Sequence, residues 1–130
     1  MTAVERHILI IDDEAPMRHM LRMVLERDGY TISEATSGRQ GLDRLQSGHY
    51  SLVLCDIRMP EMDGLVFLRE LSRKFPSTSV IMITAYGGVE SYLEAMNLGA
   101  YEYLHKPVRL DELRSVMKKI FNGGSIARVS

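Results

Sequence analysis

The chain has 130 residues, of which 45% are hydrophobic, and a formal net charge of −1. This is enough sequence for one domain with a real core. The balance of 16 basic against 17 acidic residues gives no broad nucleic-acid footprint. The single cysteine, Cys55, excludes a disulfide framework and favours a reducing compartment. The apolar run near the N-terminus is far too short to cross a membrane. We therefore expect a cytoplasmic protein with neither a membrane nor a direct nucleic-acid partner.

Short apolar runs alternate with helical patterns along the chain. The expected strands are the four apolar residues after His7, then Tyr30 to Ala35, Ser51 to Cys55, Ser79 to Ile83 and Tyr101 to Leu104. The second run is less apolar, which predicts an edge strand. Apolar residues at helical spacing mark the five helices between and after them: Met17, Met20, Leu21, Val24 and Leu25; Leu42 and Leu45 within Gly38 to Gln46; Leu65, Leu68 and Leu71; Val89, Leu93 and Met96; and Leu113, Val116, Met117, Ile120 and Phe121. Methionines at such positions favour core filling over an adaptable binding surface. Five strand–helix units predict a parallel sheet covered on both faces.

The first apolar run ends in three consecutive acids, Asp12, Asp13 and Glu14, and Pro16 opens a helical pattern just beyond them. In an open parallel sheet, ligands bind outside the carboxyl ends of the strands. Two carboxylates about 4 Å apart repel by roughly 4 kcal/mol at an effective dielectric constant of 20, so the pair favours a bound cation. The alternative is a solvated acidic turn that helps to start the next helix. This stretch by itself does not choose between the two.

Three further polar residues stand at the ends of apolar strands. Asp56 follows the third expected strand, Thr84 the fourth and Lys106 the fifth. Taken singly, a threonine there is more often a local cap and a Lys-Pro pair a loop. If the strands are neighbours, however, all of these side chains share one crevice with Asp12 and Asp13. Three carboxylates suit Mg²⁺, and a hydroxyl with an ammonium group suits an adjacent anion. The combination predicts a carboxylate nucleophile that accepts a phosphoryl group.

Four motifs follow one another along the chain: Ile11-Asp-Asp-Glu14, Asp56-Ile-Arg-Met-Pro-Glu-Met-Asp-Gly64, Ile83-Thr-Ala85 and Gly99-Ala-Tyr-Glu-Tyr-Leu-His-Lys-Pro107. In this order they make the chain resemble a response-regulator receiver domain of two-component signalling. The resemblance covers about His7 to Phe121, and its local sequence is most similar to receivers of the nitrogen-regulator class. It implies a flavodoxin-like α/β fold, with a five-stranded parallel sheet in the order 2-1-3-4-5 and helices on both faces. Residues 1–121 would then form the receiver domain, and residues 122–130 a flexible tail or the start of a linker.

The resemblance also implies a role for each polar residue. Asp56 would accept phosphate from a sensor histidine kinase or a phosphotransfer protein. Asp13, Asp56 and the backbone carbonyl of Arg58 would ligate Mg²⁺ directly, whereas Asp12 would act mainly through water. The phosphoryl oxygens would contact two side chains, Thr84 and Lys106, and the Ala85 amide. The Lys106–Pro107 peptide bond would be cis. Such a protein catalyses only its own phosphorylation and dephosphorylation.

Signal output is assigned by the same resemblance. Thr84 and Tyr103 match the family's switch pair, which would alter the surface formed by the fourth helix, fifth strand and fifth helix. That surface would control an output domain or an effector protein, or form a homodimer. Arg58 and Tyr86 stand two residues past Asp56 and Thr84. There they would hinder the approach of water and give a long-lived phosphorylated state.

Two other functions remain open. One is a phosphorylation-independent pseudo-receiver that acts as a protein-binding module, and the complete set of acids with Thr84 and Lys106 argues against it. The other is a nucleotide or flavin carrier of the same fold. A carrier needs a glycine-rich or hydroxyl-rich first loop for phosphate, whereas Asp12, Asp13 and Glu14 would repel one.

Overall fold

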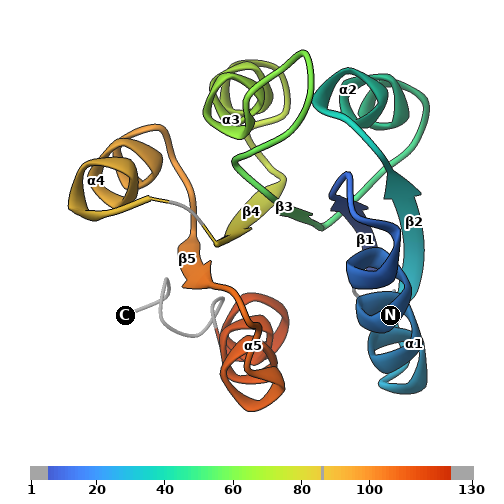
Figure 1. Ribbon diagram of the computed structural model, residues 1–130. Helices are drawn as coiled ribbons and strands as arrows, with labels where there is room; N and C mark the ends of the chain where they lie inside the picture. The colour runs from blue at the N-terminus through green and yellow to red at the C-terminus, as the bar shows by residue number, and fades with distance from the viewer. Residues whose placement is uncertain (1–5, 86, 124–130) are drawn as a thin grey trace.

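The computed structural model describes residues 6–85 and 87–123, in which strands and helices alternate along the chain (Figure 1). The elements are β1 (His7–Ile11), α1 (Ala15–Arg27), β2 (Thr31–Ala35), α2 (Gly38–Ser47), β3 (Leu52–Cys55), α3 (Gly64–Lys74), β4 (Ser79–Thr84), α4 (Val89–Asn97), β5 (Glu102–His105) and α5 (Leu110–Lys118). A π-helical turn, η1 (Lys119–Gly123), continues α5. The predicted tail therefore begins within this turn, and residues 124–130 lie outside the described residues.

The five strands form one sheet in the order β2-β1-β3-β4-β5, and every neighbouring pair is parallel. This confirms the predicted fold, including the edge position of β2. Helices α2, α3 and α4 cover one face of the sheet, and α1 and α5 cover the other (Figure 1). Parallel strands need such helical crossovers because a tight turn cannot bring the chain back to the same end of the sheet.

The core has two halves, one on each face of the sheet, and β3 contributes to both. Val53 and Cys55 face the half shared with α2, α3 and α4, whereas Leu52 and Leu54 face the half shared with α1 and α5. Successive side chains of a strand point to opposite faces, and all four are at most 1% exposed. A strand buried on both faces has no polar position, so Asp56 lies immediately beyond the core.

The strand boundaries differ from the expected ones at both ends. β2 begins at Thr31 rather than Tyr30, β3 at Leu52 rather than Ser51, and β5 at Glu102 rather than Tyr101. At the other end, β4 includes Thr84 and β5 includes His105, because these two residues pair in the parallel ladder. A strand end predicted from an apolar run falls too early at these two positions, because the last residues of the strands that pair are polar.

Several apolar residues expected in the core are instead exposed. In α1 only Leu21 and Leu25 are buried, whereas Met20 is 37% exposed, so its assignment to the core was wrong. The i, i+4 spacing of the two leucines makes a narrower contact stripe than the apolar pattern suggests. Val89 and Leu93 lie on α4 as predicted, but they are 73% and 53% exposed. No helix within the described residues has the length and apolar character needed to span a membrane.

Candidate functional site

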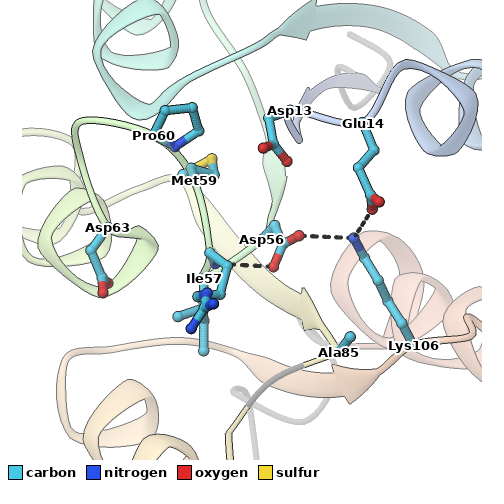
Figure 2. A pocket seen from close by; sticks show the side chains of 10 residues that line it. Asp13, Glu14, Asp56, Ile57, Met59, Pro60, Asp63, Ala85 and Lys106 are labelled. Atoms are coloured by element: carbon cyan, nitrogen blue, oxygen red, sulfur yellow. Dashed lines mark hydrogen bonds and ion pairs between the residues drawn. The ribbon is translucent and has the colours of Figure 1, made fainter.

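The predicted polar residues meet at one edge of the sheet, where β1, β3, β4 and β5 end. Ile11 pairs with Cys55, so Asp12 and Asp56 leave adjacent strands at the same level. A pocket of about 540 Å³ opens beside them (Figure 2). Its lining residues come mainly from the loops after β1 and β3: Asp13, Glu14, Asp56, Ile57, Arg58, Met59, Pro60, Asp63, Ala85 and Lys106.

Three carboxylates form a cluster at this pocket. Asp12, Asp13 and Asp56 each offer one oxygen, and these oxygens all lie within 4.8 Å of one another. Asp12 and Asp56 are 4% and 6% exposed, whereas Asp13 is exposed. Burial raises the pKa of Asp12, and hydrogen bonds from the Lys106 ammonium and the Glu14 amide only partly oppose that effect. An all-oxygen donor set of this kind fits a hard divalent cation such as Mg²⁺.

The Lys106 ammonium lies among the acids and contacts three of them. Its Nζ is 2.8 Å from Asp12 Oδ2, 2.8 Å from Asp56 Oδ2 and 3.1 Å from Glu14 Oε1. Burial lowers the pKa of Lys106, but the hydrogen bonds to Asp12, Asp56 and Glu14, together with the negative charge of Asp12, outweigh burial and raise the pKa. A single ammonium cannot neutralise these acids and Asp13, so the site keeps a negative charge. The Lys106–Pro107 bond is cis, as predicted.

The loop after β3 holds Asp56 in place. Asp56 Oδ1 accepts a hydrogen bond from the Arg58 amide at 3.2 Å. Within the same loop, the Gly64 amide donates to the Ile57 carbonyl at 2.7 Å. Asp63 caps α3 by accepting from the Leu65 amide. A Cβ atom at Gly64 would overlap the backbone carbonyl oxygen of Asp56. The first turn of α3 therefore approaches Asp56 as closely as a residue without a side chain permits.

Thr84 and Tyr103 are not among the residues that line the pocket. Thr84 is fully buried, and its carbonyl accepts a hydrogen bond from the Lys106 amide at 2.9 Å. Tyr103 is 5% exposed, and its hydroxyl lies next to Gly87 at the start of α4. Burial raises the pKa of Tyr103, and a hydrogen bond with Ser91 acts in the opposite direction. The two residues thus lie at either end of the connection from β4 to α4.

Four more residues concern the site, two with a predicted role and two without one. Arg58 is exposed and lines the pocket, whereas Tyr86 lies outside the described residues, so their effect on the phosphoryl lifetime stays a prediction. Glu14 was part of the acidic motif but had no predicted role, although it contacts Lys106. Arg18 was not singled out at all, and its Nη1 donates to the Asp12 carbonyl at 2.7 Å. The sequence carries no local signal for either contact.

Comparison with protein families supports the resemblance inferred from the motifs. Residues 8–118 match the family described as the response regulator receiver domain. The chain is 40% identical over 119 residues to the transcriptional regulatory protein ZraR of Escherichia coli, which covers 92% of this chain but 27% of ZraR. It therefore spans only about a quarter of that relative. It is 37% identical over 112 residues to sporulation initiation phosphotransferase F of Bacillus subtilis, covering 86% of this chain and 90% of that protein.

Solved structures give the same result. The response regulator TrrA from Thermotoga maritima, in complex with Mg²⁺–BeF, has a TM-score of 0.81 and 36% identity, over 88% of this chain and 98% of that one. The beryllofluoride-activated NtrC4 receiver domain dimer has a TM-score of 0.85 and 29% identity, over 91% and 98% of the two chains. The fold thus has counterparts among solved structures.

Proposed function

The chain belongs to the response regulator receiver domain family, and we propose that its Asp56 accepts a phosphoryl group in two-component signalling. One observation carries this proposal. Asp56 contributes an oxygen to the three-carboxylate cluster and also accepts a hydrogen bond from Lys106. Asp12 shares both features, but of these two carboxylates only Asp56 lines the open pocket. Asp56 is therefore the carboxylate at which a divalent cation and a phosphoryl anion could both be held. Similarity to ZraR and to the NtrC4 receiver supports the nitrogen-regulator class.

The proposed reaction is transfer from a phosphohistidine of a sensor kinase or phosphotransfer protein. An Asp56 carboxylate oxygen attacks phosphorus; the new O–P bond forms as the P–N bond breaks, and the imidazole nitrogen keeps the electron pair. The Arg58 amide orients the carboxylate through Oδ1. Lys106 Nζ, 2.8 Å from Oδ2, lies close enough to turn toward the incoming phosphoryl oxygens. The Thr84 hydroxyl is proposed to contact the same oxygens.

Mg²⁺ is the proposed cofactor, held by Asp13, Asp56 and the Arg58 carbonyl, with Asp12 acting through water. When bound, it would offset the repulsion between the carboxylates and the phosphoryl group. The donor set supports this choice because the clustered oxygens belong to acids whose charge Lys106 leaves uncompensated. The complex of TrrA with Mg²⁺–BeF supports it independently.

Phosphorylation should depend on both Asp56 and the cation. Incubation with a small phosphodonor and Mg²⁺ is expected to add the mass of one phosphate to the wild type, and none to Asp56→Asn or in the presence of a chelator. Asp63→Asn is the matched control, because Asp63 lines the same pocket outside the cluster (Figure 2) and asparagine also caps helices. Intact-protein mass spectrometry reads the result. Equal phosphate uptake by Asp56→Asn would refute the assignment of Asp56, whereas no uptake by the wild type would favour the protein-binding alternative.

For the output, we propose that phosphate at Asp56 acts through Thr84 and Tyr103 on the surface of α4, β5 and α5. This surface would control an output domain or an effector, with self-association as one form of control. Tyr103 supports the idea because its buried ring joins β5 to the start of α4 through Ser91 and Gly87. Residues 1–121 would form the unit that switches.

Addition of beryllofluoride with Mg²⁺ is expected to shift amide resonances across α4 and β5, as well as around the pocket. We expect this spread because Thr84 and Tyr103 flank the connection from β4 to α4. A conformational change at Thr84 would therefore be transmitted to Tyr103 and the start of α4. In Thr84→Ala the shifts should stay near Asp56, while Thr78→Ala, a substitution of another threonine, should leave the wild-type pattern unchanged. Shifts restricted to the pocket in the wild type would contradict the proposed switch.

A further inference from the structure

Arg18, on α1, links the loop that carries the acidic pair to strand β2. Its Nη1 donates to the backbone carbonyl oxygen of Asp12 at 2.7 Å, and its Nε donates to Glu34 Oε1 at 2.9 Å. The side chains of Arg18 and Glu34 are 14% and 24% exposed, so the contact is largely shielded from water. Arg22 binds the other oxygen of Glu34 at 2.7 Å. Glu34 therefore holds two guanidinium groups, of which one reaches the site.

The carbonyl that Arg18 contacts belongs to the peptide unit between Asp12 and Asp13. Because a peptide unit is planar, fixing the direction of its carbonyl also fixes the direction in which the chain enters Asp13. Three further hydrogen bonds hold Asp12. Its amide donates to the Ala35 carbonyl at 3.2 Å, and its carboxylate accepts from the Glu14 amide at 2.9 Å and from Lys106 Nζ at 2.8 Å. Within the described part of the chain, no hydrogen bond or ion pair holds the exposed Asp13 carboxylate. Its position therefore depends on the backbone.

We propose that Arg18, braced by Glu34, is a positioning residue that orients Asp13 toward the divalent cation. This inference rests on the proposed function, in which Asp13 is a metal ligand. A positioning role and a purely electrostatic role predict opposite changes in Mg²⁺ affinity when Arg18 is replaced. A guanidinium near the acids repels a cation, so loss of its charge alone would strengthen Mg²⁺ binding. Loss of the brace would instead weaken Mg²⁺ binding.

Arg18→Gln is expected to weaken Mg²⁺ binding about tenfold, the lower end of what the loss of an outer partner of a metal ligand usually costs. Arg18→Lys should also weaken it, because an ammonium lacks the rigid planar fork with which the guanidinium spans Glu34 and the Asp12 carbonyl. Since lysine keeps the positive charge, any change in Mg²⁺ affinity in Arg18→Lys reports the altered geometry of the contact rather than a loss of charge. Arg22→Gln is the matched control, because it removes the other guanidinium bond to Glu34, at 2.7 Å, from a residue that does not contact Asp12. This variant should bind Mg²⁺ like the wild type. The readout is the Mg²⁺ dissociation constant from an amide-shift titration without phosphodonor.

Mg²⁺ binding by Arg18→Gln as tight as, or tighter than, that of the wild type would overturn the inference. Equal weakening in Arg22→Gln would also overturn it, because the effect would then belong to the ion-pair network in general. If Arg18→Gln did not fold, Arg18→Lys would decide. Asp13→Asn separates the two proposals. If Asp13→Asn weakens Mg²⁺ binding but the Arg18 variants do not, only the positioning role of Arg18 is refuted. If the wild type does not bind Mg²⁺, both the positioning role and the proposed function are refuted.

Discussion

Lys106→Gln is expected to lower the free energy of unfolding at neutral pH by roughly 3–5 kcal/mol, the usual cost of removing one partner of a buried ion pair. The ammonium contacts Asp12 and Asp56, whose side chains are 5% and 7% exposed. Without it, two buried carboxylates face each other and lose the ammonium group that contacts both. Glutamine keeps much of the stem and one donor group, so the loss reports the charge rather than a cavity. Urea unfolding in the presence of a chelator measures it.

The pH dependence of Lys106→Gln follows from the Asp12 carboxyl. Its pKa is raised in the folded state from the ordinary value of 3.8, so the folded protein binds its proton more tightly than the unfolded chain does. The free energy of unfolding attributable to Asp12 therefore falls as the pH rises through the raised pKa. Lys106 opposes the rise, so its removal should make this fall larger and extend it to higher pH. The variant should thus recover stability relative to the wild type on acidification.

Lys74→Gln provides the matched control for Lys106→Gln. Lys74 pairs with Glu70 at 3.6 Å on an exposed part of α3, where the lysine side chain is 51% exposed. Such surface pairs contribute about 0.2–1 kcal/mol. Mg²⁺ should restore part of the stability of Lys106→Gln and change Lys74→Gln no more than the wild type. A loss in Lys106→Gln no larger than in Lys74→Gln would show that the acidic cluster does not depend on this cation.

Gly64→Ala is expected to destabilise the protein by about 2–3 kcal/mol, toward the upper part of the usual range for overpacking. The added Cβ would overlap the Asp56 carbonyl oxygen and lie 2.7 Å from Ile57 Cα. Both are backbone atoms, which no side-chain rotation can move away. The Gly64 amide also donates to the Ile57 carbonyl at 2.7 Å, so relief requires breaking that bond or shifting α3. Either movement displaces Asp56, and phosphate uptake should fall along with stability.

Denaturant unfolding of Gly64→Ala and Gly48→Ala compares a crowded glycine with an uncrowded one. Gly48 is exposed and has an extended backbone, and a Cβ there would meet Tyr50 at an ordinary 3.4 Å. Its substitution should change the free energy of unfolding by no more than about 0.5 kcal/mol, as is usual for surface positions. Similar losses in the two variants would show that the approach of α3 to Asp56 is not tight.

The placement of the site in the fold could be predicted because it depends on local patterns. Alternating buried runs and amphipathic segments give a parallel sheet, and a buried strand has no room for a carboxylate until its apolar run ends. Asp12 and Asp56 therefore had to follow β1 and β3, and parallel strands bring those ends to one edge. The order of the strands required the family resemblance, because periodicity says nothing about which strands are neighbours. The roles of these residues stay proposals.

The sequence by itself determined which elements form and which acids end the strands, because these are properties of neighbours along the chain. Only the tertiary structure decided which distant groups meet. Lys106 contacts Glu14 across 92 positions, and Arg18 bridges β2 and the Asp12 carbonyl, because loop conformation and helix packing bring those atoms within reach. The exposure of Met20 was decided in the same way, since a helical pattern gives an apolar face but not how much of it the sheet covers.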